Sequence, residues 1–337
     1  MNVPPELLGL RFGSGAQERG HVESWFLKAN DPNGPRALWV RCTIFANASS
    51  PPVAEAWAIA FDRGRGHVAT KSTVPFDRNV RFGRGTVDVA VDGCSLSLGH
   101  AKGAIANGQR ELRWDLRVGP ALAAPIVHFP RRGMYEEDSL PHSKLVTPLS
   151  DGRVNGVVEV KRSHGEAPDR WDVSEWPAMI GHNWGRGHAH LYAWTHCNVW
   201  SVPGLVFEAI SARVRVGPVL SPMATMAFVR LEGQRFDLTS VAELPKNRGN
   251  ISLRRWEMTG EAGGAKLTCE MAAETDDFVG LHYANPSGKM TYCLNSKLAR
   301  AHLDLRLPSG EQIVATSRAA ALEIATRGRG HGVKMYV

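Results

Sequence analysis

Short apolar segments recur between turn residues along the whole chain from Val22 onward. They are rich in Val, Ile, Phe, Trp and Thr, which favour β-strands. In the first half we predict strands over residues 22–28, 37–45, 54–61, 85–91, 95–98, 111–118 and 154–161. Loops such as Asn30-Asp31-Pro32-Asn33-Gly34 separate them. The pattern predicts a meander of antiparallel strands.

The second half shows the same alternation of short apolar segments and turns, but it contains no exact internal sequence repeat. We predict strands over residues 190–200, 205–216, 223–231, 251–258, 265–271, 290–298 and 301–307. Residues 317–326 are predicted to form a helix, because Ala319, Ala320, Leu322, Glu323 and Ala325 all favour one. We therefore expect an all-β protein with at most one or two short helices.

Chain length predicts two domains, because 337 residues exceed the usual size of a single core. A polar segment with scattered charges, 162–177, is predicted to be an exposed connection. We place one domain over 1–165 and the other over 166–337. Closing each meander into a barrel or a packed sandwich would remove exposed sheet edges, and a small barrel can hold one apolar ligand.

Charge and cysteine usage narrow the classes of partner. The net charge is +7, but the densest basic segments, 63–67, 81–85 and 327–331, are short and glycine-spaced, which is typical of hairpin turns rather than nucleic-acid binding. The five cysteines include no CxxC pair, so neither a disulfide framework nor a cysteine zinc site is predicted.

We expect a cytoplasmic protein, because the first twenty residues lack a secretory signal. No apolar run of about 18 residues predicts a membrane span, whereas a peripheral membrane contact and the oligomeric state stay open.

The segment 181–200 carries the most distinctive chemistry. Its even positions hold His182, Trp184, Arg186, His188, His190, Tyr192, Trp194, His196, Asn198 and Trp200. If the segment is one extended strand, all these side chains share one face. That face could be solvated, but exposed faces usually carry Lys, Glu, Ser and Thr. We favour an enclosed pocket, because polar groups in an aromatic wall are typical of small-molecule sites.

Two further acids have open roles. Glu23 and Trp25 share one side of a predicted strand, and Trp39 and Arg41 share one side of the next. If Glu23 and Arg41 are buried, they could pair, either to fix the sheet register or to serve catalysis. Glu208 lies in an apolar strand, so it is either exposed at an edge or an acid with a shifted pKa.

These residues resemble a known family. Trp176-Pro177, Gly181-His182-Asn183-Trp184-Gly185 and Trp194 are similar to the motif of AttH-like, hydroxyneurosporene-synthase-like proteins. Segments 21–30, 39–45 and 141–148 are also similar to bacterial members of that group. The resemblance covers most of the chain.

The resemblance implies a tandem lipocalin-like fold of the calycin superfamily, shared with carotenoid hydratases, tocopherol cyclase and the pericyclases of polyketide biosynthesis. It also implies a hydrophobic, unsaturated substrate from secondary metabolism, such as a terpenoid, polyene or polyketide. The implied chemistry is alkene protonation followed by water capture or ring closure, or isomerisation, without a metal or organic cofactor. His182, Asn183 and Trp184 would be the motif residues.

Protonation of an alkene requires a desolvated acid and aromatic faces that stabilise a cation. Our hypothesis is that Glu23, His182, His188 or His196 donates the proton. The predicted ligand-binding residues are Trp25, Trp39, Arg41, Asn183, Trp184, His190, Tyr192, Trp194, Asn198 and Glu208. The expected partner is a hydrophobic small molecule, and no cofactor is expected.

Two alternatives stay open. The protein could bind a hydrophobic metabolite without transforming it, with the aromatic and histidine wall serving recognition only. It could also be a metal enzyme, because His188 and His190 lie two positions apart on a predicted strand, with His182 and His196 nearby.

Overall fold

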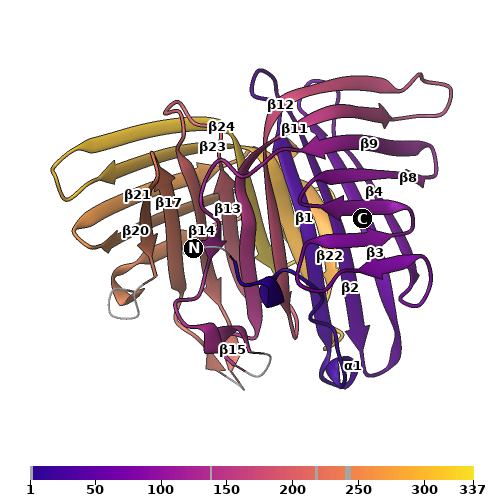
Figure 1. The fold of residues 1–337 in the computed structure, drawn as a ribbon, viewed down its shortest axis with the longest axis horizontal. Coiled ribbons are helices and arrows are strands. Elements are labelled where there is room, and N and C mark those ends of the chain that lie inside the picture. The colour runs from indigo at the N-terminus through magenta and orange to yellow at the C-terminus, as the bar shows by residue number, and fades with distance from the viewer. Residues whose placement is uncertain (1–2, 137–138, 217–218, 240–243) are drawn as a thin grey trace.

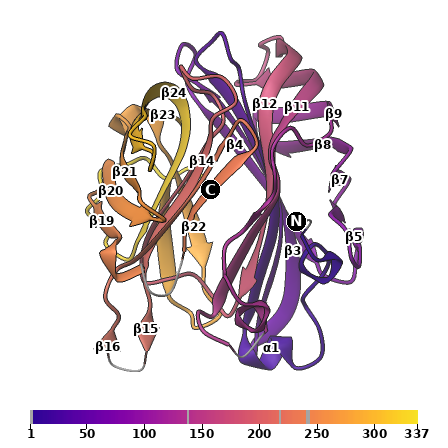
Figure 2. The same ribbon diagram turned by 60° about the vertical axis from the view of Figure 1, so that its left-hand side comes forward.

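Two large antiparallel sheets make up almost the whole protein. The computed structural model describes residues 3–136, 139–216, 219–239 and 244–337. The sheets lie beside each other as two layers, the first built from the N-terminal half and the second from the C-terminal half (Figures 1 and 2). This arrangement confirms the predicted all-β fold in two tandem parts. No helix among the described residues is long and apolar enough to span a membrane.

The first sheet holds twelve strands. They are β1 (His21–Asn30), β2 (Arg36–Asn47), β3 (Ser50–Asp62), β4 (Val68–Pro75), β5 (Val80–Phe82), β6 (Asp88–Val91), β7 (Cys94–Ser97), β8 (His100–Asn107), β9 (Arg110–Val118), β10 (Ile126–Val127), β11 (Ser143–Lys161) and β12 (Asp169–Gly185). Their order is β4-β3-β2-β1-β12-β11-β9-β8-β7-β6-β5, and β10 pairs with β11.

The second sheet holds ten strands. They are β13 (Leu191–Cys197), β14 (Val206–Arg213), β17 (Ala224–Leu231), β18 (Gln234–Leu238), β19 (Arg248–Ile251), β20 (Arg255–Ala262), β21 (Ala265–Ala272), β22 (Val279–Ala284), β23 (Met290–Arg306) and β24 (Gln312–Thr326). The remaining elements are the pair β15 (Arg215–Val216) and β16 (Val219–Leu220), helix α1 (Ala16–Arg19), and the 3-10 turns η1 (Pro5–Leu7), η2 (Arg132–Tyr135), η3 (Leu244–Lys246) and η4 (Thr275–Asp277).

The two sheets share one topology. The second sheet runs β18-β17-β14-β13-β24-β23-β21-β20-β19, with β22 added beside β23. In each sheet a long strand, β11 or β23, pairs first with a short strand and then with a neighbour earlier in the chain. Its hairpin partner, β12 or β24, then pairs with the first strand of the meander. The halves are therefore duplicates in architecture, although no sequence repeat is recognisable.

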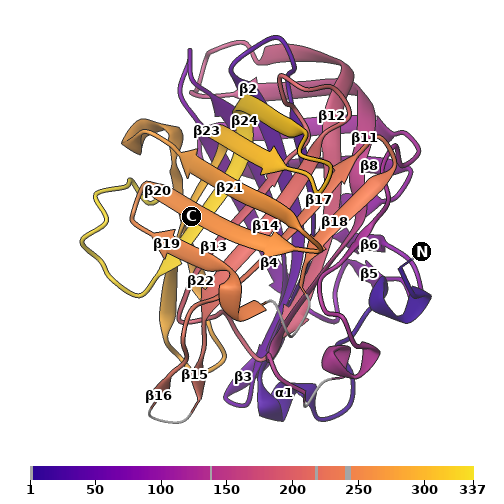
Figure 3. The same ribbon diagram turned by 90° about the vertical axis from the view of Figure 1, so that its left-hand side faces the viewer.

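Each sheet curls around its own apolar core. In the first sheet β4 contacts β8 and β9, and in the second β18 contacts β20. Figure 3 shows β19, β20 and β21 in front of β13 and β14. Alternate residues of each strand point into the curl, such as Trp25 and Leu27 in the first half and Phe207 and Ala209 in the second.

A third apolar cluster fills the space between the sheets. It is formed by the residues of β1 to β4 and β12 that point away from the first core, together with the equivalent residues of β13 and β22 to β24. Its buried members are Phe26, Ala37, Trp39, Trp57, Ile59, Phe61, Ala69, Met179, Tyr192, Trp194, Val279, Leu281, Tyr283, Cys293, Leu298, Ala321 and Ala325. Strands in this region are consequently buried on both faces, as β1 is along its whole length.

The structure corrects four predictions. Residues 317–326 belong to strand β24 and not to a helix, because pairing with β13 and β23 outweighs helix propensity. Most of 162–177 lies in β12, where Trp171 and Trp176 are buried, and the rest is the turn between β11 and β12, so the segment does not connect the two halves. The chain passes between sheets only after Gly185, later than the boundary placed at 165 and 166. Finally, 182–200 is not one strand: β12 ends at Gly185 and β13 begins at Leu191.

Candidate functional site

A cavity of about 320 Å³ lies between the two sheets. Aromatic and aliphatic side chains dominate its wall. Its lining includes Val22, Phe26, Trp39, Arg41, His128, Phe129, Met134, Lys144, Leu145, Asn183, Trp184, His188, Tyr192, Trp194, Ile210, Ala212, Ala224, Met226, Tyr283 and Glu323. The cavity is therefore formed by facing outer surfaces of the two halves rather than by the interior of either one.

A buried histidine and glutamate pair borders this cavity. His128 follows β10, is 1% exposed and lines the cavity. Its Nε2 lies 2.9 Å from Oε1 of Glu208, which is completely buried on β14. The other ring nitrogen of His128, Nδ1, is buried and has no hydrogen-bond partner among the described residues. A ring oriented by a carboxylate with its second nitrogen unengaged is the arrangement of a general acid or base.

Glu208 is held by donors from both sheets. Thr147 of β11 donates to Oε2 at 2.8 Å, and the indole of Trp194 on β13 donates to Oε1 at 3.0 Å. Burial by itself raises the pKa of Glu208, but the field and hydrogen bond of His128, together with His196 and the Trp194 hydrogen bond, outweigh it, so the pKa lies below the ordinary value. Glu208 is thus a carboxylate that fixes the His128 ring, and of the two predicted alternatives the edge-exposed one is wrong.

The opposite end of the cavity holds a cationic residue. Arg41 of β2 is 5% exposed, and its Nη2 donates to Oγ of Ser24 at 2.5 Å. Its guanidinium lies 4.5 Å from the ring centroid of Tyr283 on β22. The ring of His188 stacks on the same tyrosine, with centroids 4.8 Å apart. Burial and then the charge of Arg41 lower the pKa of His188 to about 3, so this imidazole is neutral.

A third polar cluster lies between these two ends. The buried Lys297 donates to Oε1 of Glu323 at 2.8 Å and to Asn295 at 2.7 Å. Its ammonium also lies 5.5 Å from the ring centroids of Trp39 and Trp194. The charge of Glu323 is therefore already matched by a lysine.

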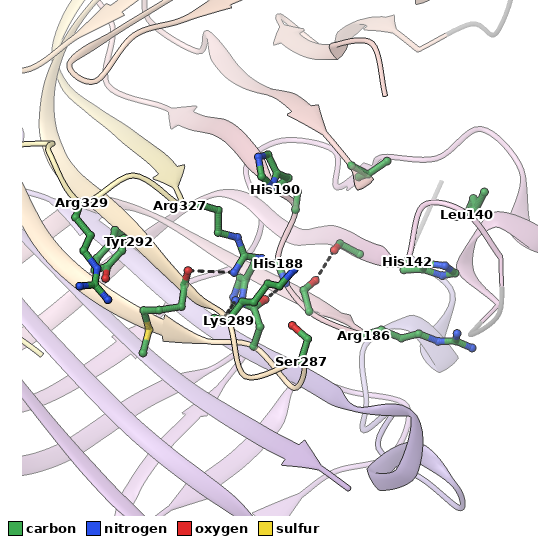
Figure 4. A pocket seen from close by; sticks show the side chains of 16 residues that line it. Leu140, His142, Arg186, His188, His190, Ser287, Lys289, Tyr292, Arg327 and Arg329 are labelled. Atoms are coloured by element: carbon green, nitrogen blue, oxygen red, sulfur yellow. Dashed lines mark hydrogen bonds between the residues drawn. The ribbon is translucent and has the colours of Figure 1, made fainter. Parts of the chain in front are cut away.

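The cavity adjoins a wider basic groove of about 690 Å³. Ser143, Gly187, His188, Ala189 and Val214 line both spaces. The groove also carries the cationic and imidazole side chains of His142, Arg186, His190, Lys289, Arg327 and Arg329 (Figure 4). Among the described residues that line it, there is no aspartate or glutamate. The approach to the cavity is consequently electropositive.

Glu23 and His182 lie on the other face of the first sheet and do not line the cavity. Glu23 accepts the backbone N–H groups of Arg11 and Phe12, and its oxygens lie 2.9 Å from His21 and 3.0 Å from His182. Burial raises the pKa of Glu23, but the hydrogen bonds and electrostatic attraction of His182 and His21 outweigh it, so the pKa lies below the ordinary value.

The motif histidine also anchors the N-terminal segment. The Nδ1 of His182 lies 2.8 Å from the Leu7 carbonyl, and its ring stacks between Trp25 and Trp184. The predicted pair of Glu23 with Arg41 is wrong: Arg41 is opposite Phe26 across the strands, and Phe26 points away from the face that carries Glu23 and Trp25.

His196 and Asn198 serve a network near one edge of the interface. Nε2 of His196 donates to the Ser150 carbonyl at 2.8 Å. Burial and then the charge of Lys28 lower the pKa of His196 to about 3. Asn198 accepts from Lys28 at 3.0 Å and donates to Asp151 at 2.7 Å. These contacts join the sheets, and neither residue lines the cavity.

The structure brings together only part of the predicted site. The predicted residues that line the cavity are Trp39, Arg41, Asn183, Trp184, His188, Tyr192 and Trp194. Those that do not line it are Glu23, Trp25, His182, His190, His196, Asn198 and Glu208, although Glu208 lies directly behind its wall. His128 and Tyr283 were not predicted from the sequence. A single histidine between Pro125 and Pro130 in an otherwise apolar segment was the available signal for His128.

The predicted metal-binding histidines are not brought together. His188 stacks on Tyr283, His196 bonds to Ser150, and the side chain of His182 lies on the face of the first sheet that points away from the cavity. In the part of the chain that the structure describes, no group of three or more His, Cys, Asp or Glu side chains is placed to hold a metal ion.

Comparison with known proteins gives matches over most of the chain. A family model described as "Tocopherol cyclase-like" matches residues 76–326. An uncharacterized protein of Mycobacterium tuberculosis, Rv0493c, is 27% identical over 290 residues, which cover 85% of this chain and 82% of that protein.

Solved structures share the fold. An AttH-type protein from Nitrosomonas europaea aligns over 97% of this chain and 99% of its own, with a TM-score of 0.55 and 14% identity. CghA aligns over 92% of this chain and 90% of its own, with a TM-score of 0.59 and 11% identity, and a CghA structure with Sch210972 gives a TM-score of 0.58. These similarities confirm the predicted tandem lipocalin-like architecture.

Proposed function

We propose a cyclase- or hydratase-type reaction for this chain, because it belongs to the Tocopherol cyclase-like family. The substrate would be a hydrophobic, unsaturated molecule of the terpenoid, polyene or polyketide class, bound in the cavity between the sheets. The observation that carries the proposal is the buried pair of His128 and Glu208 at the wall of an otherwise apolar cavity. This pair replaces the donors considered from sequence alone.

In this mechanism His128 transfers the proton and Glu208 positions it. With Nε2–H directed at Glu208, a proton on Nδ1 passes to a carbon of the substrate double bond. The resulting cation is captured by a hydroxyl of the substrate, which closes a ring, or by water. The oxygen that adds then loses its proton, and His128 recovers one proton per turnover. Trp184 and Trp194, which line the cavity, supply aromatic faces that stabilise the cation.

The strength of the acid limits the substrate. An imidazolium is a much weaker acid than the one needed to protonate an isolated alkene. We therefore infer that the double bond is electron-rich, either through an electron-donating substituent or through conjugation to further double bonds. The large apolar wall contributes binding and excludes water from the cation.

Deuterium incorporation tests the reaction. The protein is incubated in deuterium oxide with a panel of prenylated quinols, polyenones and terpenoids, and products are analysed by mass spectrometry. We expect a cyclised or hydrated product with deuterium on carbon, and a loss of roughly a hundredfold or more in rate for His128→Gln and Glu208→Gln. His100→Gln, on the surface beside Asp115, is the matched control and should keep full activity.

Two other outcomes would indicate a different function or a different proton donor. Recovery of every compound unchanged would indicate a binding protein and would contradict the proposal. Full activity in His128→Gln with activity lost in His182→Gln would move the proton donor to the opposite face of the first sheet.

A further inference from the structure

We propose that the cavity binds an elongated amphipathic acid, whose carboxylate pairs with Arg41 while its unsaturated body extends toward His128. The direction of the ligand rests on the proposed function, but the acidic group is inferred from Arg41 independently.

Arg41 is a buried cation without a counter-ion among the residues that the structure describes. Its one hydrogen bond within the described chain is to the Ser24 hydroxyl, its Nε has no partner, and it takes part in no ion pair there. Burying a charge is costly unless an opposite charge compensates it. Because Arg41 lines the cavity, a ligand can provide that charge, and a carboxylate matches the paired N–H groups of a guanidinium.

Glu323, the carboxylate that lines the cavity, does not serve as the counter-ion of Arg41. Glu323 accepts from Lys297 and Asn295, so its charge is already compensated within the second sheet. Beside Arg41 there is instead further unused polar capacity, because the buried Nδ1 of His188 also has no partner among the described residues. Both groups lie against the ring of Tyr283.

The topology places Arg41 and His128 at opposite ends of the cavity. Arg41 is on β2 and His128 follows β10, with β1, β12 and β11 in between. The second sheet repeats this separation, since Glu208 is on β14 and Tyr283 on β22, with β13, β24 and β23 in between. Each path is four steps of roughly 4.8 Å between strands. A ligand that reaches both ends must be elongated, and its middle passes Phe26 and Trp194.

The basic groove reaches the Arg41 end of the cavity through His188. His188 lines both spaces and stacks on the tyrosine that lies under Arg41. Arg327 points toward His188, while Arg186 and His142 lie on the other side of the groove (Figure 4). A positive entrance attracts anions and raises their association rate. The acidic end of the ligand therefore remains near the entrance, and the apolar body occupies the deeper part.

Fluorescence titration with cis-parinaric acid, a conjugated polyene acid, and its methyl ester tests the inference. We expect the wild-type protein to bind the acid roughly tenfold or more tightly than the ester. Arg41→Met should remove this preference while ester binding persists, and Arg41→Lys should retain part of it. Arg117→Met, exposed on β9 outside the cavity, is the matched control. Arg329→Met tests whether the charge of the groove contributes to the preference for the acid.

Three results would overturn the inference. These are equal wild-type binding of acid and ester, an equal loss of both in Arg41→Met, or a preference that survives Arg41→Met but disappears in Arg329→Met. If Arg41→Met does not fold by circular dichroism, the wild-type comparison alone decides. The preference for acid is measured again in His128→Gln, so a failure of the catalytic proposal is separable from a failure of this one.

Discussion

Several buried ionisable residues lie between the two sheets. Lys28, Arg41, Lys297, Glu208 and Glu323 all have side chains on this inner surface. Lysines and glutamates are rarely buried without a partner, so most are held in short hydrogen-bond networks. These networks specify one arrangement of the sheets and leave Arg41 as the exception.

A buried neutral histidine makes stability depend on pH. Burial and then Lys28 lower the pKa of His196 to about 3, below the ordinary value of 6.5. As pH falls below 6.5 the unfolded chain takes up a proton that the folded protein excludes, so folding weakens. Between pH 7 and pH 5 this residue alone should remove about 2 kcal/mol of stability.

His196→Gln tests this dependence. The glutamine amide can still donate to Ser150, but it does not titrate. We expect urea unfolding to show a smaller loss of stability on acidification for the variant than for the wild-type protein. Identical slopes over this range would contradict the assignment.

Strand alternation predicts which residues share a face but not what that face meets. The shared side of Trp39 and Arg41 followed directly from their spacing, and both line the cavity. The pairing of Glu23 with Arg41 did not follow, because the register places these residues on opposite faces. When both faces of a strand are buried, sequence offers no contrast between a core and a ligand surface.

At the scale of elements, the chain leaves the first sheet at a glycine. Gly185 ends β12 with a φ of 151°, and a Cβ there would lie 1.9 Å from the carbonyl oxygen of His142. This conformation breaks the alternation of residues 182–200 into a strand, a loop and a second strand. The sequence pattern alone continues through it, which is why a single strand was predicted.

Gly185→Ala should therefore destabilise the protein by about 2–4 kcal/mol, since the added Cβ forces the backbone of β11 to move. Thermal unfolding measures the effect. Gly99→Ala is the control, because a Cβ at that position meets no atom within 4 Å. An equal change in melting temperature for both variants would count against this explanation.

Strand β24 is a second element that differs from its prediction, which rested on helix propensity. Ala319, Ala320 and Ala325 are buried within β24, where small side chains allow close packing against both the second core and the first sheet. Alanine favours helices, but in β24 its small side chain is what allows it to pack between two layers. Local propensity could not reveal this, because the partners of β24 lie far away in sequence.

At the scale of the whole molecule, the interface is too apolar for the halves to be independent. Seventeen buried residues form a cluster shared by both sheets. Arg63 also joins the halves, with its guanidinium 2.7 Å and 3.0 Å from the carboxylate oxygens of Asp277. Separation would expose this surface to water.

We accordingly expect one cooperative unfolding transition for the full chain, with equal calorimetric and van't Hoff enthalpies. Differential scanning calorimetry measures both. Two resolved transitions, or a stable folded fragment of residues 1–185, would show that the halves fold independently.

The position of the cavity between two curled sheets also bears on how such a protein can diversify. Because each barrel interior is packed by its own side chains, the ligand chamber can be remodelled by substitutions on the apposed outer surfaces without disturbing either hydrophobic centre. A duplicated scaffold of this kind separates the residues that maintain folding from those that choose the ligand, so selection can act on the second group alone.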